Sequence, residues 1–110
     1  MDDLKTFTVK PAASRAEVIE WLRAEEAAIR ALGATALYLF GSAARDEMTA
    51  DSDVDLYFDY PRDDGFDYYA LCDMERLAEA VTGREVDLAT RYGLHPELRD
   101  RIESTAIKVF

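Results

Sequence analysis

The stretch from residue 35 to residue 59 constrains the fold of this chain more than any other, because it holds two strand-like segments joined by a short polar connection. The first segment, 35–40, is almost entirely apolar and has the length of a buried strand. It ends at Gly41 and Ser42, and a glycine there lets the backbone approach a phosphate group because it has no side chain. The pattern predicts a buried strand that leads into a phosphate-binding turn, with a short helix from about residue 43.

The second segment, 53–59, alternates polar and apolar residues, which places Asp53 and Asp55 on one face of a strand. Aspartate is disfavoured in strands, and two neighbouring carboxylates repel each other unless a cation lies between them. A glycine-serine turn that faces such a pair is the minimum equipment for Mg²⁺-dependent phosphoryl chemistry. A calcium-binding loop is excluded, because Leu56 and Arg62 stand where that loop needs a glycine and a glutamate.

Helical and strand patterns alternate along the rest of the chain. We expect helices at 66–81 and 96–103 and strands at 85–89 and 106–110, with a turn at 61–65. Such alternation is typical of an α/β protein, and we expect one mixed sheet with helices packed on it and the carboxylates on its open face. The single histidine, His95, precedes Pro96 at a predicted helix start, so its expected role is that of a cap.

The first helix is predicted to open at a capping box formed by Ser14 and Glu17 and to continue without a break to a stop at Gly33. The helix at 66–81 is amphipathic. Its inward side chains are predicted to be Tyr69, Ala70, Met74 and Leu77.

Length and composition predict one domain, residues 1–110, with the balance of apolar and charged residues of an ordinary globular protein. The net charge of −10 repels phosphate backbones, which disfavours direct binding to nucleic acid, whereas a basic protein partner is attracted. No segment approaches the ~20 apolar residues of a membrane span, and the N-terminus lacks a signal-peptide pattern. We therefore expect a cytoplasmic protein without a membrane partner, in which the one cysteine, Cys72, is a buried thiol.

The glycine-serine turn, the ten residues that follow it and the Asp-x-Asp pair together resemble the signature of the nucleotidyltransferase superfamily, which has the DNA polymerase β-like fold. The chain is most similar to the smallest members, the minimal nucleotidyltransferases (MNT proteins). Many of these read Gly-Ser-x-Ala-Arg-Gly, and this chain has Asp46 in place of the last glycine. The run 94–102 also resembles the end of the family, so the likeness covers nearly the whole chain.

The resemblance implies an enzyme that uses ATP and two Mg²⁺ ions held by three carboxylates, Asp53, Asp55 and Asp87. In the family, the third carboxylate comes from a strand after the Asp-x-Asp pair. Asp87 lies at the centre of the predicted strand 85–89, and Glu85 is the alternative because it has the same parity. Asp87 would also activate the acceptor hydroxyl.

The resemblance also implies nucleotide-binding roles for Gly41 and Ser42, which would contact the β- and γ-phosphates. Arg45 lies one helical turn after Ser42, so its guanidinium can reach the same ligand. The alternative for Arg45 is a surface ion pair with Asp46 or Asp51.

We expect a chain of this length to lack the acceptor-binding domain of larger relatives, so the resemblance implies a partner. MNT proteins are commonly encoded beside HEPN proteins, which are helical ribonuclease toxins, and act as type VII-like antitoxins that transfer AMP to a tyrosine of the toxin. Two alternatives stay open. The chain could instead neutralise its partner by contact alone with a catalytically weak site, or modify an antibiotic together with a separate helical subunit. A homo-oligomer is also compatible with the sequence.

Overall fold

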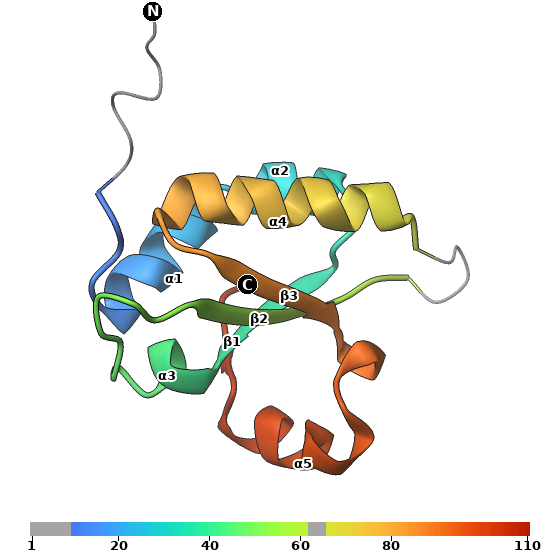
Figure 1. Ribbon diagram of the computed structural model, residues 1–110. Coiled ribbons are helices and arrows are strands. Elements are labelled where there is room, and N and C mark those ends of the chain that lie inside the picture. Colours follow the sequence, from blue (N-terminus) through green and yellow to red (C-terminus); the bar gives the residue numbers. More distant parts are fainter. Residues whose placement is uncertain (1–9, 62–65) are drawn as a thin grey trace, which may run out of the picture.

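The computed structural model describes residues 10–61 and 66–110, and within them four strands form one sheet in the order β3-β2-β1-β4 (Figure 1). β1 pairs antiparallel with β2 and with β4, whereas β2 and β3 are parallel, so the predicted mixed sheet is confirmed. The strands are β1 (Ala36–Phe40), β2 (Val54–Asp59), β3 (Val86–Thr90) and β4 (Ile107–Lys108).

Helices lie on both sides of the sheet but cover it unequally. The helices are α1 (Arg15–Arg23), α2 (Glu26–Ala31), α3 (Gly41–Ala44), α4 (Tyr68–Thr82) and α5 (Pro96–Thr105), with a short 3₁₀-helix η3 (Arg91–Gly93). α1, α2 and α4 cover one face, α3 continues from the end of β1, and α5 lies on the opposite side (Figure 1). No helix in the described part of the chain is long and apolar enough to cross a membrane.

The face under α1, α2 and α4 holds the main core, as the alternation along β2 predicts. Val54, Leu56 and Phe58 are each at most 1% exposed. In the register, Leu56 and Phe58 lie opposite Leu39 and Leu37 of β1, which are also buried. The helices complete this layer with Val18, Leu22, Ile29, Met74 and Ala78.

The other face is covered at one end and open at the other. Tyr57 has the same parity as Asp55 yet is only 1% exposed. Its ring stacks on Tyr38 with a centroid distance of 4.7 Å, and the Arg91 guanidinium lies 5.1 Å from its centre. The carboxylates therefore lie on the open part of a face whose other half is buried under aromatic rings and an arginine.

The helix that opens at Ser14 is two helices in the structure, so the prediction of one continuous helix was wrong. The capping residue is confirmed, because the Glu17 N–H donates to Ser14 Oγ at 3.2 Å. Between α1 and α2 the Glu25 N–H donates to the Leu22 carbonyl at 3.0 Å, a bond over three residues that tightens the turn as in a 3₁₀-helix. The apolar spacing is helical on both sides of this turn, so the pattern does not reveal the break.

α4 turns most of the predicted face to the core, because Met74 is buried and Leu77 packs against the core cluster, but Tyr69 is an exception. The buried residues of α4 are Met74, Ala78 and Thr82, which repeat every four positions. Ala70, four residues before Met74, continues this row of side chains along the helix. Tyr69 lies outside the row and is 78% exposed. The prediction that Tyr69 points inward was wrong because the stripe is set by its partners in the sheet.

The C-terminus forms a final strand, as predicted, although the regular part of β4 is shorter than 106–110. The structure places it beside β1. Beyond β4, the Val109 N–H donates to the Leu37 carbonyl at 2.8 Å, and the Leu37 N–H donates to the Phe110 carbonyl at 3.0 Å. The pairing with β1 therefore extends to the last residue. Of the predicted turn at 61–65, residues 62–65 lie outside the described part of the chain.

Candidate functional site

The glycine-serine turn lies directly against one of the predicted carboxylates. α3 begins at Gly41 itself, earlier than predicted, so turn and helix are one unit. Gly41 has a φ of +74°, in the left-handed region that favours glycine. A Cβ atom at this position would collide with Oδ2 of Asp55 and would lie 3.2 Å from its Cγ. Only glycine lets the turn come this close to Asp55.

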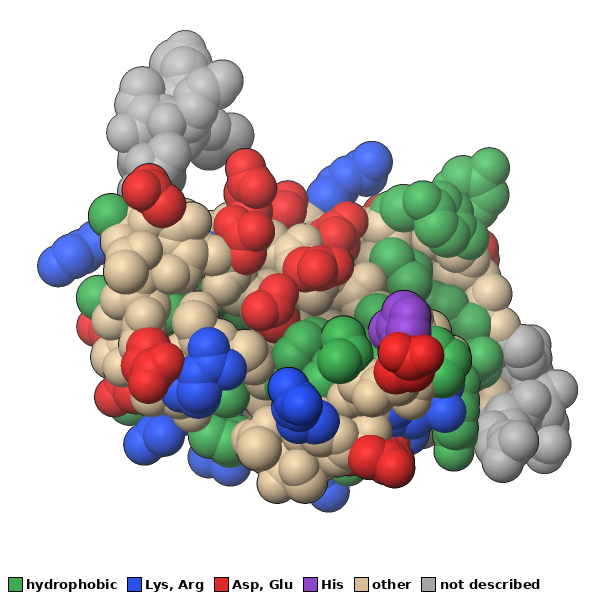
Figure 2. Space-filling view, turned by 60° about the horizontal axis from the view of Figure 1, so that its bottom comes forward, with side chains coloured by type: hydrophobic (Ala, Val, Ile, Leu, Met, Phe, Trp, Pro, Cys, Tyr) green, Lys and Arg blue, Asp and Glu red, His purple; other side chains and the backbone are tan. Residues whose placement is uncertain are grey.

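The structure brings the three predicted carboxylates to the same end of the sheet. Asp55 and Asp87 are direct partners in the parallel register of β2 and β3, and neighbouring strands lie about 4.8 Å apart. Asp53 stands one residue before β2. Asp53 and Asp87 are exposed and Asp55 is half-buried. Acidic side chains form a band across this face in Figure 2. Glu85, the alternative third carboxylate, is exposed just before β3.

The environment of Asp55 disfavours its negative charge. Burial raises the pKa of this carboxyl most, the charges of Asp87 and Asp53 raise it further, and Arg45 acts in the opposite direction. A carboxylate that its surroundings destabilise in this way is stabilised by a bound cation. Perturbed carboxyl groups are also frequent at functional sites.

The carboxylates offer oxygen ligands to a metal ion that arrives with a substrate, but they do not form a complete metal site by themselves. Among the described residues, no three Asp, Glu, His or Cys side chains are close enough together to hold an ion by themselves, as expected for like charges without a cation between them. Mg²⁺ keeps several waters and is usually bound by one or two carboxylates plus substrate phosphates. Asp55 and Asp87, which face each other across two strands, provide oxygens of this kind.

Arg45 lies near the carboxylates but is paired elsewhere. Its Nε donates to Glu47 Oε1 at 2.9 Å, and 61% of its side chain is exposed. Neither Asp46 nor Asp51, the expected surface partners, forms this pair. Because the Arg45 charge still opposes the raised pKa of Asp55, the guanidinium is close enough to act on the site electrostatically.

Asp46 points away from the carboxylates and toward α1. Its φ is +59°, so this position has the left-handed backbone that explains a glycine in many similar sequences. Its Oδ1 accepts a hydrogen bond from the N–H of Arg15, the first residue of α1, at 2.8 Å. The carboxylate thus satisfies one of the unpaired N–H groups at a helix start and is favoured by the helix dipole.

One arginine that the sequence analysis did not select ties together the segments around the site. Arg84 Nε donates to the Ala12 carbonyl at 2.6 Å, and its Nη1 donates to the carbonyls of Thr49 and Ser52, both at 2.8 Å. Arg84 precedes β3, and Ser52 precedes Asp53. The Arg84 side chain therefore ties the segment before β2 to the start of β3. A lone arginine after a glycine gives no signal of this role in the sequence.

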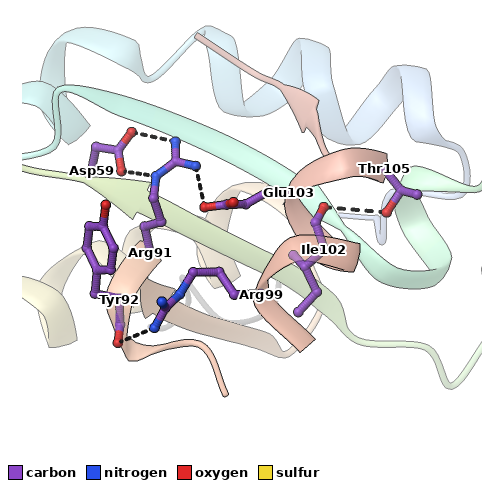
Figure 3. Close-up of polar contacts among 7 residues, drawn as sticks. All are labelled: Asp59, Arg91, Tyr92, Arg99, Ile102, Glu103 and Thr105. Carbon is purple, nitrogen blue, oxygen red and sulfur yellow. Dashed lines mark hydrogen bonds and ion pairs between the residues drawn. The ribbon is translucent and has the colours of Figure 1, made fainter. Parts of the chain in front are cut away.

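A second such group, also missed, closes the far end of the same face (Figure 3). Arg91 donates through Nε and Nη2 to both oxygens of Asp59, at 2.8 and 2.9 Å. Its Nη1 donates to Glu103 Oε2 at 2.8 Å, which connects α5 to the sheet. These two carboxylates raise the pKa of the Arg91 guanidinium, so Arg91 is a permanent cation.

Two polar residues near the site have structural roles. The single histidine is the cap of α5, as predicted, because the Glu97 N–H donates to His95 Nδ1 at 3.1 Å. Ser52 Oγ accepts a hydrogen bond from the Thr49 N–H at 2.8 Å, which stabilises the turn before Asp53.

A family model described as the nucleotidyltransferase domain matches residues 23–109, and the chain belongs to this family. The predicted class of enzyme and its fold are thereby confirmed. The chain is similar to a Methanocaldococcus jannaschii protein, MJ0435, that is named as a protein adenylyltransferase: the two are 38% identical over 74 residues, which cover 64% of this chain and 74% of that protein.

Solved structures show the same fold. One, described as a minimal nucleotidyltransferase, is 32% identical to this chain with a TM-score of 0.65. The match covers 81% of this chain and 93% of the chain in that structure. A toxin–antitoxin structure with AMP-PNP has a TM-score of 0.62 at 19% identity, with coverages of 87% and 72%. A tri-AMPylated Shewanella oneidensis HEPN toxin with an MNT antitoxin has a TM-score of 0.59 at 16% identity, with coverages of 84% and 71%. The last two support the fold alone.

Proposed function

We propose that this chain transfers AMP from ATP to a hydroxyl group of a HEPN-family partner protein and thereby acts as its antitoxin. The observation that carries the proposal is the contact of the Gly41 turn with Asp55, which lies opposite Asp87. A backbone turn without a side chain beside two facing carboxylates suits a triphosphate and its metal. The similarity to MJ0435, named as a protein adenylyltransferase, supports a protein as the acceptor.

In the proposed reaction, the acceptor oxygen attacks the α-phosphorus of ATP, and pyrophosphate leaves as that P–O bond breaks. Asp87 accepts the proton of the attacking hydroxyl, while Asp53 and Asp55 fix the reactive end of the nucleotide. Asp53, Asp55 and Asp87 would hold two Mg²⁺ ions together with the nucleotide, and these ions would neutralise charge on the triphosphate. Gly41 and Ser42 hold the β- and γ-phosphates, and Arg45 turns from Glu47 toward them. Phosphoryl transfer needs mainly such positioning and charge neutralisation, which a small domain supplies.

We propose a tyrosine of the partner as the acceptor. The net charge of −10 disfavours a nucleic-acid acceptor. The Shewanella oneidensis HEPN toxin, found AMPylated beside an MNT antitoxin of the same fold, supports a toxin as the modified protein. Contact-only neutralisation has no specific observation in its favour, because the carboxylates of the site are intact.

The test combines this protein, a HEPN-family protein from the same genome, labelled ATP and Mg²⁺. We expect label on a tyrosine of the HEPN protein, located by mass spectrometry, and none on RNA. Replacing Asp53→Asn and Asp55→Asn together should abolish labelling without loss of the fold. Asp51→Asn is the control, because it makes the same kind of substitution, with the loss of one charge, at an exposed position outside the strand and should label normally.

Asp87→Asn separates the enzyme from a contact antitoxin. ATP binding should stay close to that of the wild type, since Asp53 and Asp55 remain, while transfer should stop. Cells that express the toxin should then lose protection. Full protection by Asp87→Asn, with no AMP on the toxin, would overturn the enzymatic proposal in favour of neutralisation by contact.

A further inference from the structure

A cavity of about 560 Å³ lies at the end of β2 and β3 that is remote from the carboxylates. Its volume is in the range of pockets that hold a ligand or several side chains of a partner. Its walls come from the last residues of β2 and the segment after β3, the region drawn in Figure 3. The lining residues are Phe58, Asp59, Tyr60, Arg91 and Tyr92. We call it the strand-end cavity.

The charged groups of the strand-end cavity do not favour an anion. Each guanidinium nitrogen of Arg91 already donates to Asp59 or Glu103, so three of its five N–H groups are used and its positive charge is neutralised by these two carboxylates. The carboxylates, in contrast, have lone pairs available for further donors, since each can accept about four hydrogen bonds. Arg99, which stacks on Tyr92, adds a second positive charge nearby, so the local charge is close to zero and the attraction for cations comes from the net charge of −10 of the whole chain.

Aromatic rings in this region already hold guanidinium groups. The Arg91 Cζ lies 5.1 Å from the centres of both Tyr38 and Tyr57, and the Arg99 Cζ lies 4.9 Å from the centre of Tyr92. Tyr60 adds a further ring to the cavity wall. Such faces attract cations through the ring quadrupole.

One of the large hydrophobic side chains that the described part of the chain exposes, Tyr92, lines the cavity itself. The large hydrophobic side chains exposed in the described part of the chain are Tyr68, Tyr69, Tyr92 and Leu98, at 71%, 78%, 68% and 47%. They come from the start of α4, from η3 and from α5. In Figure 2, hydrophobic side chains gather around the histidine, beside the band of acidic groups. α5 itself has no buried residue. Exposed aromatic side chains beside a pocket are characteristic of the centre of a protein interface.

We infer that the strand-end cavity receives an arginine or lysine side chain of the acceptor protein, with the surrounding tyrosines forming the apolar part of the interface. This inference rests on the proposed function and deepens it by locating the partner. A second copy of this chain is a poor occupant, because two proteins with a charge of −10 repel each other.

The position of the cavity agrees with a role in presenting the acceptor. Asp59, in its wall, lies four residues after Asp55 on β2, a distance of about 13 Å along a strand. A standard protein interface buries about 800 Å² on each partner and is thus about 30 Å across. A partner anchored in the cavity therefore also covers the carboxylates.

The decisive variants change one exposed residue, Tyr92, at the cavity wall. Tyr92→Lys removes a ring and adds a like charge, and the Kd for the HEPN-family protein should rise about 10-fold or more. Tyr92→Phe keeps the ring and should bind as the wild type does. Ala27→Lys is the matched control, because it adds the same charge at an exposed position of α2 on the other side of the sheet.

Transfer kinetics distinguish this inference from the proposed function. Tyr92→Lys should raise KM for the HEPN protein about 10-fold, with unchanged kcat and unchanged affinity for ATP. Wild-type KM in Tyr92→Lys, with normal transfer by the wild type, would overturn the inference alone. If the wild type neither binds nor modifies the HEPN protein, both the proposed function and the inference fail.

A second measurement needs no partner protein. N-acetyl-arginine amide, titrated into the wild type, should shift the NMR resonances of Tyr60 and Tyr92, and N-acetyl-glutamate amide at the same concentration should not. Equal shifts with both probes, or none with the arginine probe, would contradict a cation-selective cavity.

Discussion

The two ends of β2 carry acidic residues on the same face of the sheet and use them in opposite ways. At one end, Asp55 faces Asp87, and burial, followed by the like charges of Asp87 and Asp53, raises the pKa of Asp55. At the other end, Asp59 binds Arg91 through both oxygens, and Glu103 completes the neutralisation. The first arrangement costs stability and leaves the carboxylates ready for a cation, whereas the second stabilises the fold and connects α5 to the sheet.

The alternation of residues along a strand shows which side chains share a face of the sheet, but it does not show what each of them does there. Asp55 and Asp59 have the same parity on β2 and are both half-buried. The two aspartates differ in the partner that they face. Asp55 faces Asp87 on the neighbouring strand, whereas Asp59 binds Arg91. Charges without a compensating partner are therefore the better guide to the functional end of this face.

The largest expected effect comes from making the same aspartate-to-asparagine substitution at the two ends of β2. Asp55→Asn should reduce AMP transfer on the order of 10³-fold, because it removes charge that acts on the reacting phosphates, and should leave the fold intact. Asp59→Asn should leave kcat at saturating partner near that of the wild type, because Asp59 lies in the strand-end cavity and not among the carboxylates, and should lower the melting temperature. Transfer assays and thermal melts of both variants check this, and equal losses of activity would contradict the division between the two ends.

Gly41→Ala should be the most damaging of the small substitutions at the carboxylate end. The new methyl group would collide with Asp55, and the φ of +74° is strained for alanine. We expect a loss of about 3 kcal/mol in the free energy of unfolding, measured with urea, and greatly weakened binding of AMP-PNP. Gly83→Ala is the control, because its φ of +70° strains alanine in the same way while Gly83 lies at the C-cap of α4 rather than against Asp55. A tolerated Gly41→Ala would argue against the close approach of the turn to Asp55.

Arg91→Met tests the stabilising end. The guanidinium is 22% exposed and pairs with Asp59 and Glu103, so its loss leaves two partly buried carboxylates without a partner. We expect a cost of about 2 kcal/mol in urea unfolding, less than for a fully buried pair. Arg76→Met, which breaks an exposed pair with Asp73 in α4, should cost less than about 0.5 kcal/mol. Similar costs for the two variants would remove the contrast between the ends.

The smallest effect concerns the pH dependence of stability. Because the pKa of Asp55 is raised in the folded state, its ionised form destabilises the fold, and this cost is present above the folded pKa. In metal-free buffer, Asp55→Asn should therefore melt at a higher temperature than the wild type at pH 7. The gain should shrink as the pH falls through the folded pKa and vanish below the unfolded one, where the wild-type carboxyl is neutral.

Thermal melts of the wild type, Asp55→Asn and the control Asp51→Asn between pH 3 and pH 8 measure this effect. Asp51 lies in an exposed turn before β2, so its substitution should show no comparable gain. A gain for Asp55→Asn that is independent of pH would show that charge repulsion is not its cause.

Local pattern determined much of the fold. The apolar run 35–40, the alternation after Asp53 and the capping signals at Ser14 and His95 each depend on residues a few positions apart, and the structure confirms them. The break between α1 and α2 and the exposure of Tyr69 did not follow from pattern. Helical periodicity is the same on both sides of the break, and the exact register of α4 depends on what it packs against.

For the candidate site, the sequence by itself determined the identity and parity of the carboxylates and the glycine beside them. Only the tertiary structure decided that Gly41 contacts Asp55 and that Asp55 faces Asp87. It also decided the partners of Arg84 and Arg91, which lie up to 72 and 32 residues away in the chain. The physical reason is that an arginine side chain is long and flexible and can bind any nearby carbonyl or carboxylate. Which one it meets is set by the pairing of strands that are distant in sequence.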